Sequence, residues 1–129
     1  MTKKSRSVFT GFDLKDARDR LGMTQRELAD ELCIARTSVI KAERDTPKPW
    51  MEAACIGLGG MRIYREGFSN LTGERFGRMR EKFGFTAEML GSEWGVTERT
   101  IRSWEHGVPP AWALPAIVGL SIMTSLDVR

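Results

Sequence analysis

An internal repeat with an offset of 62 residues is the feature of this sequence that most constrains its fold. When the chain of 129 residues is aligned with itself at that offset without a gap, identical residues coincide in both halves. The identical pairs are Thr10 and Thr72, Gly11 and Gly73, Arg18 and Arg80, Gly22 and Gly84, Thr24 and Thr86, Leu28 and Leu90, Glu31 and Glu93, Glu43 and Glu105, Pro47 and Pro109, Trp50 and Trp112, Ala54 and Ala116, Gly57 and Gly119, and Leu58 and Leu120. Because such a repeat encodes one supersecondary unit twice, two similar small domains are expected.

The start of the first copy carries clear helix start and stop signals. Thr10 is suited to cap a helix, and Gly22 is suited to end it. Thr24 and Glu27 form a capping box, in which the hydroxyl and the carboxylate each satisfy a backbone amide at the start of a helix. The sequence therefore predicts a second helix that runs to about Leu32.

A short turn follows that second helix. Only residues 33–35 separate it from a further predicted helix over 36–44, so the two helices must cross at a steep angle. The second copy has stronger signals at the same place, because Gly95 suits the turn and Thr97 suits a helix cap. A last helix is expected to begin near Trp50 in the first copy and at the equivalent position of the second.

Composition is typical of a soluble globular protein, with 41% hydrophobic and 29% charged residues. The longest apolar stretch, residues 111–123, is shorter than the roughly 20 residues that a membrane helix needs, and no export segment is visible, so a cytoplasmic location in a bacterial or phage-infected cell is expected. Cys33 and Cys55 lack the spacing of a metal site and are expected to be buried, reduced thiols.

Charge is distributed unevenly between the two copies. The net charge is +3, and residues 1–62 hold 12 Lys and Arg against 9 Asp and Glu, whereas residues 63–129 hold 8 against 8. This distribution is compatible with an anionic partner for the first copy. The basic residues Lys3, Lys4 and Arg6 suit either an arm that lies on such a partner or a solvated tail.

Both copies resemble the Cro/repressor (XRE-type) helix-turn-helix family of phage and bacterial regulators. The resemblance rests on residues 24–29 of the first copy and on residues 85–107 of the second. It implies an all-α chain with two tandem lambda-repressor-like helix-turn-helix domains of about four helices each. Domain 1, with its basic N-terminal arm, is expected over 1–60, a linker over 61–71 and domain 2 over 72–129.

The family resemblance also implies a function. Such a chain is expected to be a sequence-specific, double-stranded DNA-binding transcriptional regulator, a repressor of the phage or mobile-element type, and not an enzyme. No nucleophile–base constellation or metal cluster is visible. No cofactor, metal, small-molecule ligand or membrane partner is therefore expected.

The helices that begin at Arg36 and Glu98 are the recognition helices that the resemblance implies, and these would enter the major groove. A helical wheel agrees, since the outward positions lie opposite Val39 in the first copy. Arginine matches the acceptors of guanine, glutamate accepts from cytosine, and Ile40 suits a thymine methyl group. The expected base-reading residues are Arg36, Thr37, Ile40, Lys41, Glu98, Arg99, Arg102 and Ser103.

Further residues are expected to contact the DNA backbone or to brace the domains. Gln25 resembles the phosphate-contacting glutamine of the family, but the second copy has Ala87 in its place. The expected backbone contacts are Gln25, Arg26, Arg44, Lys48, Thr86 and His106. The resemblance also implies two ion pairs between the first helix and the recognition helix of each copy, Arg18 with Glu43 and Arg80 with Glu105.

Other interpretations remain open at the level of sequence. The paired helices could form a packing unit that does not contact DNA. Alternatively, one copy binds DNA and the other is a dimerisation or partner-binding module, as in an antitoxin. A homodimer is compatible with the apolar residues near the end of the chain, Ile117, Val118, Leu120, Ile122 and Met123. Two reading heads, in contrast, would need recognition helices about 34 Å apart, a distance that the connector between the copies can span.

Overall fold

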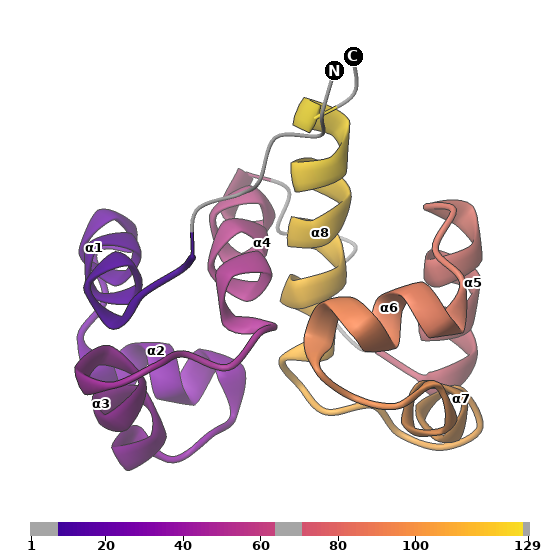
Figure 1. The fold of residues 1–129 in the computed structure, drawn as a ribbon, viewed down its shortest axis with the longest axis horizontal. Helices are drawn as coiled ribbons and strands as arrows, with labels where there is room; N and C mark the ends of the chain where they lie inside the picture. The colour runs from indigo at the N-terminus through magenta and orange to yellow at the C-terminus, as the bar shows by residue number, and fades with distance from the viewer. Residues whose placement is uncertain (1–7, 64–70, 128–129) are drawn as a thin grey trace.

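The computed structural model describes residues 8–63 and 71–127, and these residues form α-helices and no strand. The helices are α1 (Gly11–Leu21), α2 (Gln25–Leu32), α3 (Arg36–Arg44), α4 (Met51–Ile63), α5 (Gly73–Lys82), α6 (Ala87–Trp94), α7 (Glu98–Glu105) and α8 (Ala113–Asp127). Helices α1 to α3 lie on one side of the molecule and α5 to α7 on the other, with α4 and α8 side by side between them (Figure 1). The predicted all-α class is confirmed.

The predicted helix caps of the first copy are present. The Thr10 hydroxyl accepts a hydrogen bond from the amide of Asp13, and the Asp13 carboxylate accepts one from the Thr10 amide. Thr24 and Glu27 make the same reciprocal pair of hydrogen bonds at the start of α2. Gly22 ends α1 with a φ of 72°, in the left-handed region where a residue without a side chain is favoured.

The two copies differ at the turn between the crossing helices. Gly95 ends α6 with a φ of 73°, and the hydroxyl of Thr97 caps α7. In the first copy the left-handed position is taken by Cys33, with a φ of 55°, and Ala35 offers no side-chain cap to α3. The expectation that both thiols are buried is wrong for Cys33, because the end of α2 directs this residue to solvent, whereas Cys55 is buried in α4.

The buried apolar residues of both copies belong to one continuous core. Leu14, Leu28 and Val39 are almost fully buried in the first copy, as are their counterparts in the second. The crossing of α6 and α7 is tight, since a Cβ atom on Gly91 would lie 2.6 Å from the carbonyl oxygen of Val96. Small residues at this position therefore allow the steep crossing that the short turn requires.

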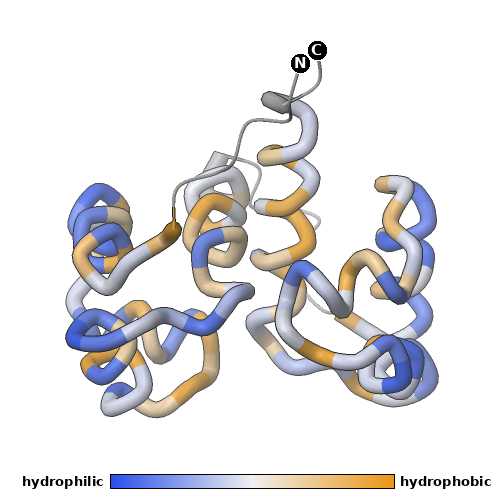
Figure 2. Tube along the Cα trace, viewed as in Figure 1, coloured by the Kyte–Doolittle hydropathy of each residue, from blue (hydrophilic) through white to orange (hydrophobic). Residues whose placement is uncertain are grey.

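Helices α4 and α8 touch through their backbones and join the two copies. A Cβ atom on Gly57 would lie 1.7 Å from the carbonyl oxygen of Pro115, and one on Gly119 would lie 1.7 Å from that of Ala53. Figure 2 shows hydrophobic residues along this central pair, whereas hydrophilic and hydrophobic residues alternate along the outer helices. The two halves are therefore held together by an interface that only glycine permits.

The α4–α8 interface has approximate two-fold symmetry. Trp50 stacks on Trp112, the residue 62 positions later, with ring centroids 4.0 Å apart. The close approaches of Gly57 and Gly119 are reciprocal under the same offset. Contacts between equivalent residues are the mark of a two-fold interface in a homodimer. The two copies thus form a pseudo-symmetric pair within one chain.

Helix α4 continues to Ile63 and so includes the first residues of the connector that is expected over 61–71. Gly59 and Gly60 suggest the end of a helix, but α4 accommodates both. A Cβ atom on Gly60 would lie 2.9 Å from the side chain of Ile122. The basic residues of the expected arm at 3–6, and the middle of the connector, lie outside the described residues. Within the described residues, no helix is long and apolar enough to span a membrane.

Candidate nucleic-acid interface

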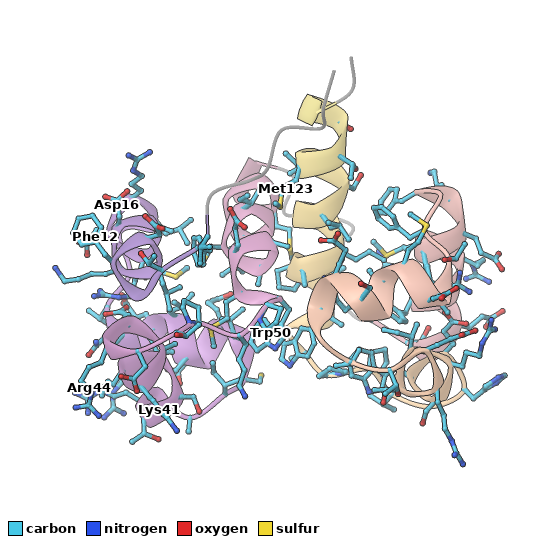
Figure 3. All side chains as sticks on the ribbon, viewed as in Figure 1. Phe12, Asp16, Lys41, Arg44, Trp50 and Met123 are labelled. Carbon is cyan, nitrogen blue, oxygen red and sulfur yellow. The ribbon has the colours of Figure 1, made fainter. Side chains whose placement is uncertain are left out.

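Helix α3 presents a cationic face to solvent. Its apolar residues Val39 and Ala42 are buried, whereas Arg36, Lys41 and Arg44 are exposed. Figure 3 shows Lys41 and Arg44 extending away from α4 and α8. In the described part of the chain, none of these three cations is paired with a carboxylate. They are therefore available to an anionic partner.

The remaining expected base-reading residues of α3 lie beside these cations. Thr37 is exposed, and Ile40 is half-buried. An apolar side chain that remains partly exposed among cations can contact the methyl group of a thymine. The outer face of α3 therefore combines charged, hydroxyl and apolar groups, as a surface that discriminates between bases requires.

Helix α7 presents a different set of side chains on the equivalent face. Ile101 is buried, whereas Glu98, Arg99, Arg102 and Ser103 are exposed. Two of the exposed residues are paired, because Arg102 donates hydrogen bonds to the carboxylate of Glu98. The spacing of four residues within a helix already indicates such a pair. Glu98 and Arg102, which were each expected to read a base, therefore contact one another.

The ion pair of the first copy braces α1 against α3. Arg18 Nε lies 2.6 Å from Glu43 Oε2, and Arg18 Nη1 donates to the carbonyl oxygen of Met23. The side chains of Arg18 and Glu43 are only 10% and 7% exposed. The hydrogen bond to Glu43 raises the pKa of Arg18 above its ordinary value, although burial opposes this effect. The guanidinium is therefore a permanent charge that fixes the recognition helix on its domain.

The second copy repeats this arrangement. Arg80 donates to the carboxylate of Glu105 and to the carbonyl oxygen of Phe85, which occupies the position of Met23 in the repeat. The hydrogen bond to Glu105 raises the pKa of Arg80 in the same way. Helices α3 and α7 are thus held by the same three-way contact, which couples each of them to the first helix of its copy and to the loop after that helix.

Gln25 differs from the other residues that are expected to contact the DNA backbone. Its side-chain Nε2 donates to Glu43 Oε1 at 3.0 Å, so its amide joins the ion pair of the first copy. This contact was not visible in the sequence, because it depends on which rotamer Gln25 adopts. A phosphate contact by Gln25 would therefore have to use its remaining polar atoms or follow a change of rotamer.

The other expected backbone contacts lie at the surface. Arg26, Arg44, Lys48 and His106 are exposed. Thr86 is exposed too, but its hydroxyl accepts a hydrogen bond from the amide of Met89 and so caps α6. The exposed cations of this group belong mainly to the first copy.

One comparison with known proteins identifies part of this arrangement. A helix-turn-helix family model matches residues 14–52, from α1 through α2 and α3 to the start of α4. The match supports an XRE-type helix-turn-helix over these residues, a kind of DNA-binding domain that is typical of transcriptional regulators. The family model does not detect the second copy. No curated protein and no solved structure matches the chain.

Proposed function

We propose that this protein is a transcriptional repressor that binds one double-stranded operator with both halves, placing α3 and α7 in the major groove at two half-sites. One observation carries the proposal. The α4–α8 interface relates the halves by pseudo-two-fold symmetry, and α3 and α7 lie at the same end of the molecule (Figure 1). Dimeric helix-turn-helix proteins use such symmetry to reach two half-sites on one face of DNA.

The first half supports the proposal through its charge. Arg36, Lys41 and Arg44 lie on the outer face of a helix-turn-helix whose family binds DNA. Cations that neutralise phosphates release counterions, and this supplies much of the affinity for DNA. Arginine can also bind the two major-groove acceptors of guanine.

The second half supports the proposal through its geometry. Although the family model does not match the second half, its helices α5 and α6 repeat the threonine caps of α1 and α2, and the second half also repeats the short turn and the buried ion pair of the first. Arg99, Arg102 and Ser103 are exposed on α7, where a base-reading surface is required. Because these residues differ from their counterparts in α3, the two half-sites are expected to differ in sequence.

Part of the apolar surface of α8 is used within the molecule, although Val118, Ile122 and Met123 are only half-buried. Ile117 and Leu120 are 0% and 3% exposed, because α8 packs against α4. Ile117 and Leu120 are therefore not available to a second chain. A single chain with two heads makes a second chain unnecessary for reading two half-sites.

Selection of bound duplexes from a random DNA library tests the proposal. We expect a consensus with two parts, separated by about one helical turn, and both Arg36→Ala and Arg99→Ala should weaken binding to it. Arg78→Ala is the matched control, because Arg78 is an exposed arginine of α5 outside the recognition helices. Enrichment of no sequence would refute the proposal, and normal affinity of Arg99→Ala would instead assign α7 to a protein partner.

The dependence of affinity on salt provides an independent measurement. For B-DNA, the logarithm of the association constant falls with the logarithm of salt concentration by roughly 0.9 for each neutralised phosphate. Substitution of a residue that contacts phosphate should reduce this slope by about one unit on any sequence. Lys48→Ala tests this expectation, since Lys48 is exposed just after α3.

A further inference from the structure

We infer that Glu98 is a positioning residue, which holds Arg102 ready to bind guanine, and not a reader of cytosine. The inference rests on the proposed function and specifies the chemistry of its second half-site. It also makes the two half-sites unequal at one pair of symmetry-related positions, with guanine opposite Arg102 and thymine opposite Ile40.

The hydrogen bonds of Arg102 leave one edge of its guanidinium open. Arg102 Nε and Nη2 lie 3.0 and 2.8 Å from the same atom, Glu98 Oε2. The edge formed by Nη1 and Nη2 therefore keeps the parallel N–H groups that bind O6 and N7 of guanine. The Arg102 side chain is 58% exposed, so a base can approach this edge.

The pair of Glu98 and Arg102 has more hydrogen bonds than two other described ion pairs with the same spacing of four residues. Arg20 Nε lies 3.1 Å from Asp16 Oδ2, and Arg78 Nη1 lies 2.9 Å from Glu74 Oε2, both on the outer helices α1 and α5. Among these three pairs of the described residues, it is Arg102 that places two guanidinium nitrogens on one carboxylate oxygen. Since a free arginine loses rotamer entropy when it binds, an arginine that is already oriented loses less.

The position of Glu98 also argues against a direct contact with cytosine. Glu98 is the first residue of α7. The partial positive charge of the helix N-terminus stabilises its carboxylate in this position. Its Oε2 already accepts two hydrogen bonds from Arg102. A contact of the same oxygen with cytosine would compete with these bonds.

The first copy lacks the pair at the equivalent positions. The 62-residue offset places Arg36 where the second copy has Glu98, and Ile40 where it has Arg102. Ile40 is half-buried and can offer a base only an apolar contact. In the major groove the apolar feature of a base is the methyl group of thymine. The pseudo-two-fold axis thus relates Arg102, which would contact guanine, to Ile40, which would contact the methyl group of thymine.

Selection of bound duplexes by wild-type protein and single variants tests the role of Glu98. Arg102→Ala should reduce the preference for guanine at one base pair by roughly 5- to 150-fold, as expected for a bidentate contact. Glu98→Ala should weaken the preference at the same base pair by about two- to fivefold, since an exposed ion pair contributes this much. Glu98→Gln, which keeps the shape of the side chain, should fall between wild type and Glu98→Ala. Glu74→Ala, which breaks the similar pair on α5, should leave the consensus unchanged.

The thymine contact has its own probe. Replacing the thymine opposite Ile40 by deoxyuridine removes only the methyl group, and affinity should fall by about fourfold for wild type. Ile40→Ala should bind the two duplexes equally. Wild-type protein that does not distinguish them would overturn this half of the inference.

Failure of the inference and failure of the proposed function give different results. If Glu98→Ala loses a preference for cytosine at a separate base pair, or changes no preference, Glu98 is not a positioning residue although the protein still binds its operator. If wild-type protein enriches no sequence, the proposed function fails before Glu98 is tested. Circular dichroism of each variant verifies that α7 remains folded.

Discussion

Trp50 and Trp112 stack across the boundary between the two halves, with their ring planes inclined by only 7°. They occupy the same position in the repeat, and equivalent residues can meet in this way only near a two-fold axis. The glycines of α4 and α8 meet close to the same axis. A single chain therefore contains the interface of a symmetric dimer.

Gly57→Ala should destabilise the protein strongly. The new methyl group would lie 1.7 Å from the carbonyl oxygen of Pro115, so α4 and α8 would have to separate. Overpacking of a core typically costs about 1–3 kcal/mol, and a clash with backbone should cost at least that much. Gly59→Ala is the matched control, because its methyl group would lie 3.7 Å from Leu21 and alanine favours a helix. Urea denaturation should separate the two variants, and equal midpoints would contradict the backbone contact.

Cys33→Gly should stabilise the protein. Cys33 is the only residue other than glycine with a positive φ in the described chain, and the left-handed conformation costs a side chain about 1–2 kcal/mol. Glycine removes this cost and reproduces Gly95 of the second copy. Cys33→Ala keeps the cost, so its thermal midpoint should stay near that of wild type. A gain in stability from alanine but not from glycine would show that the backbone is not strained at this turn.

Glu43→Ala should be the most damaging single change to the position of α3. It leaves the mostly buried Arg18 without its carboxylate and removes the acceptor of Gln25. Loss of one partner of a buried pair typically costs about 3–5 kcal/mol. Glu74→Ala breaks an exposed pair, which should change the free energy of unfolding by about 1 kcal/mol or less. Similar losses in the two variants, measured by chemical denaturation, would be inconsistent with a buried pair.

The two thiols should differ in reactivity. Burial raises the pKa of Cys55 from 9.0 to about 12, with smaller contributions from nearby carboxylates, whereas Cys33 is exposed. Because the thiolate is the reactive form, a thiol reagent should modify only Cys33 in the folded protein, and both thiols after unfolding. Mass spectrometry of the modified protein gives the count. Rapid modification of Cys55 under native conditions would indicate that α4 opens.

The same pKa shift predicts a loss of stability in alkali. The folded state holds the Cys55 proton more tightly than the unfolded state, so this contribution is complete below the unfolded pKa and is lost as the pH rises from about 9 towards 12. Over that range, wild type should lose stability relative to Cys55→Ala. Parallel curves for the two proteins would exclude a buried thiol.

Much of the fold could be predicted, because its signals are local. The Thr10 and Thr24 caps and the glycine ends of α1 and α6 follow from the chemistry of helix termini, and the repeat places equivalent threonine caps at Thr72 and Thr86. The outward faces of α3 and α7 follow from helical periodicity. The helices and the faces that they bury could therefore be predicted from the sequence.

The arrangement of α4 against α8 could not be predicted, because it depends on contacts between distant residues. Gly57 and Gly119 indicate flexibility when each is considered alone, and only the assembled pair shows that they allow the backbones to touch. The orientation of the Gln25 amide towards Glu43 is a choice between rotamers that no sequence pattern specifies. These features arise from tertiary structure and not from local propensity.

Because the two halves of this pseudo-symmetric molecule are unequal, the orientation of the protein on DNA matters. A dimer of identical subunits can be turned end for end without any change in what it presents to a neighbour. In this protein, the same end-for-end rotation would exchange Ile40 with Arg102. It would also exchange the free cations of α3 with the ion pair of α7. An operator bound by these two faces would fix which way the protein points, so that its upstream and downstream flanks would never be interchangeable.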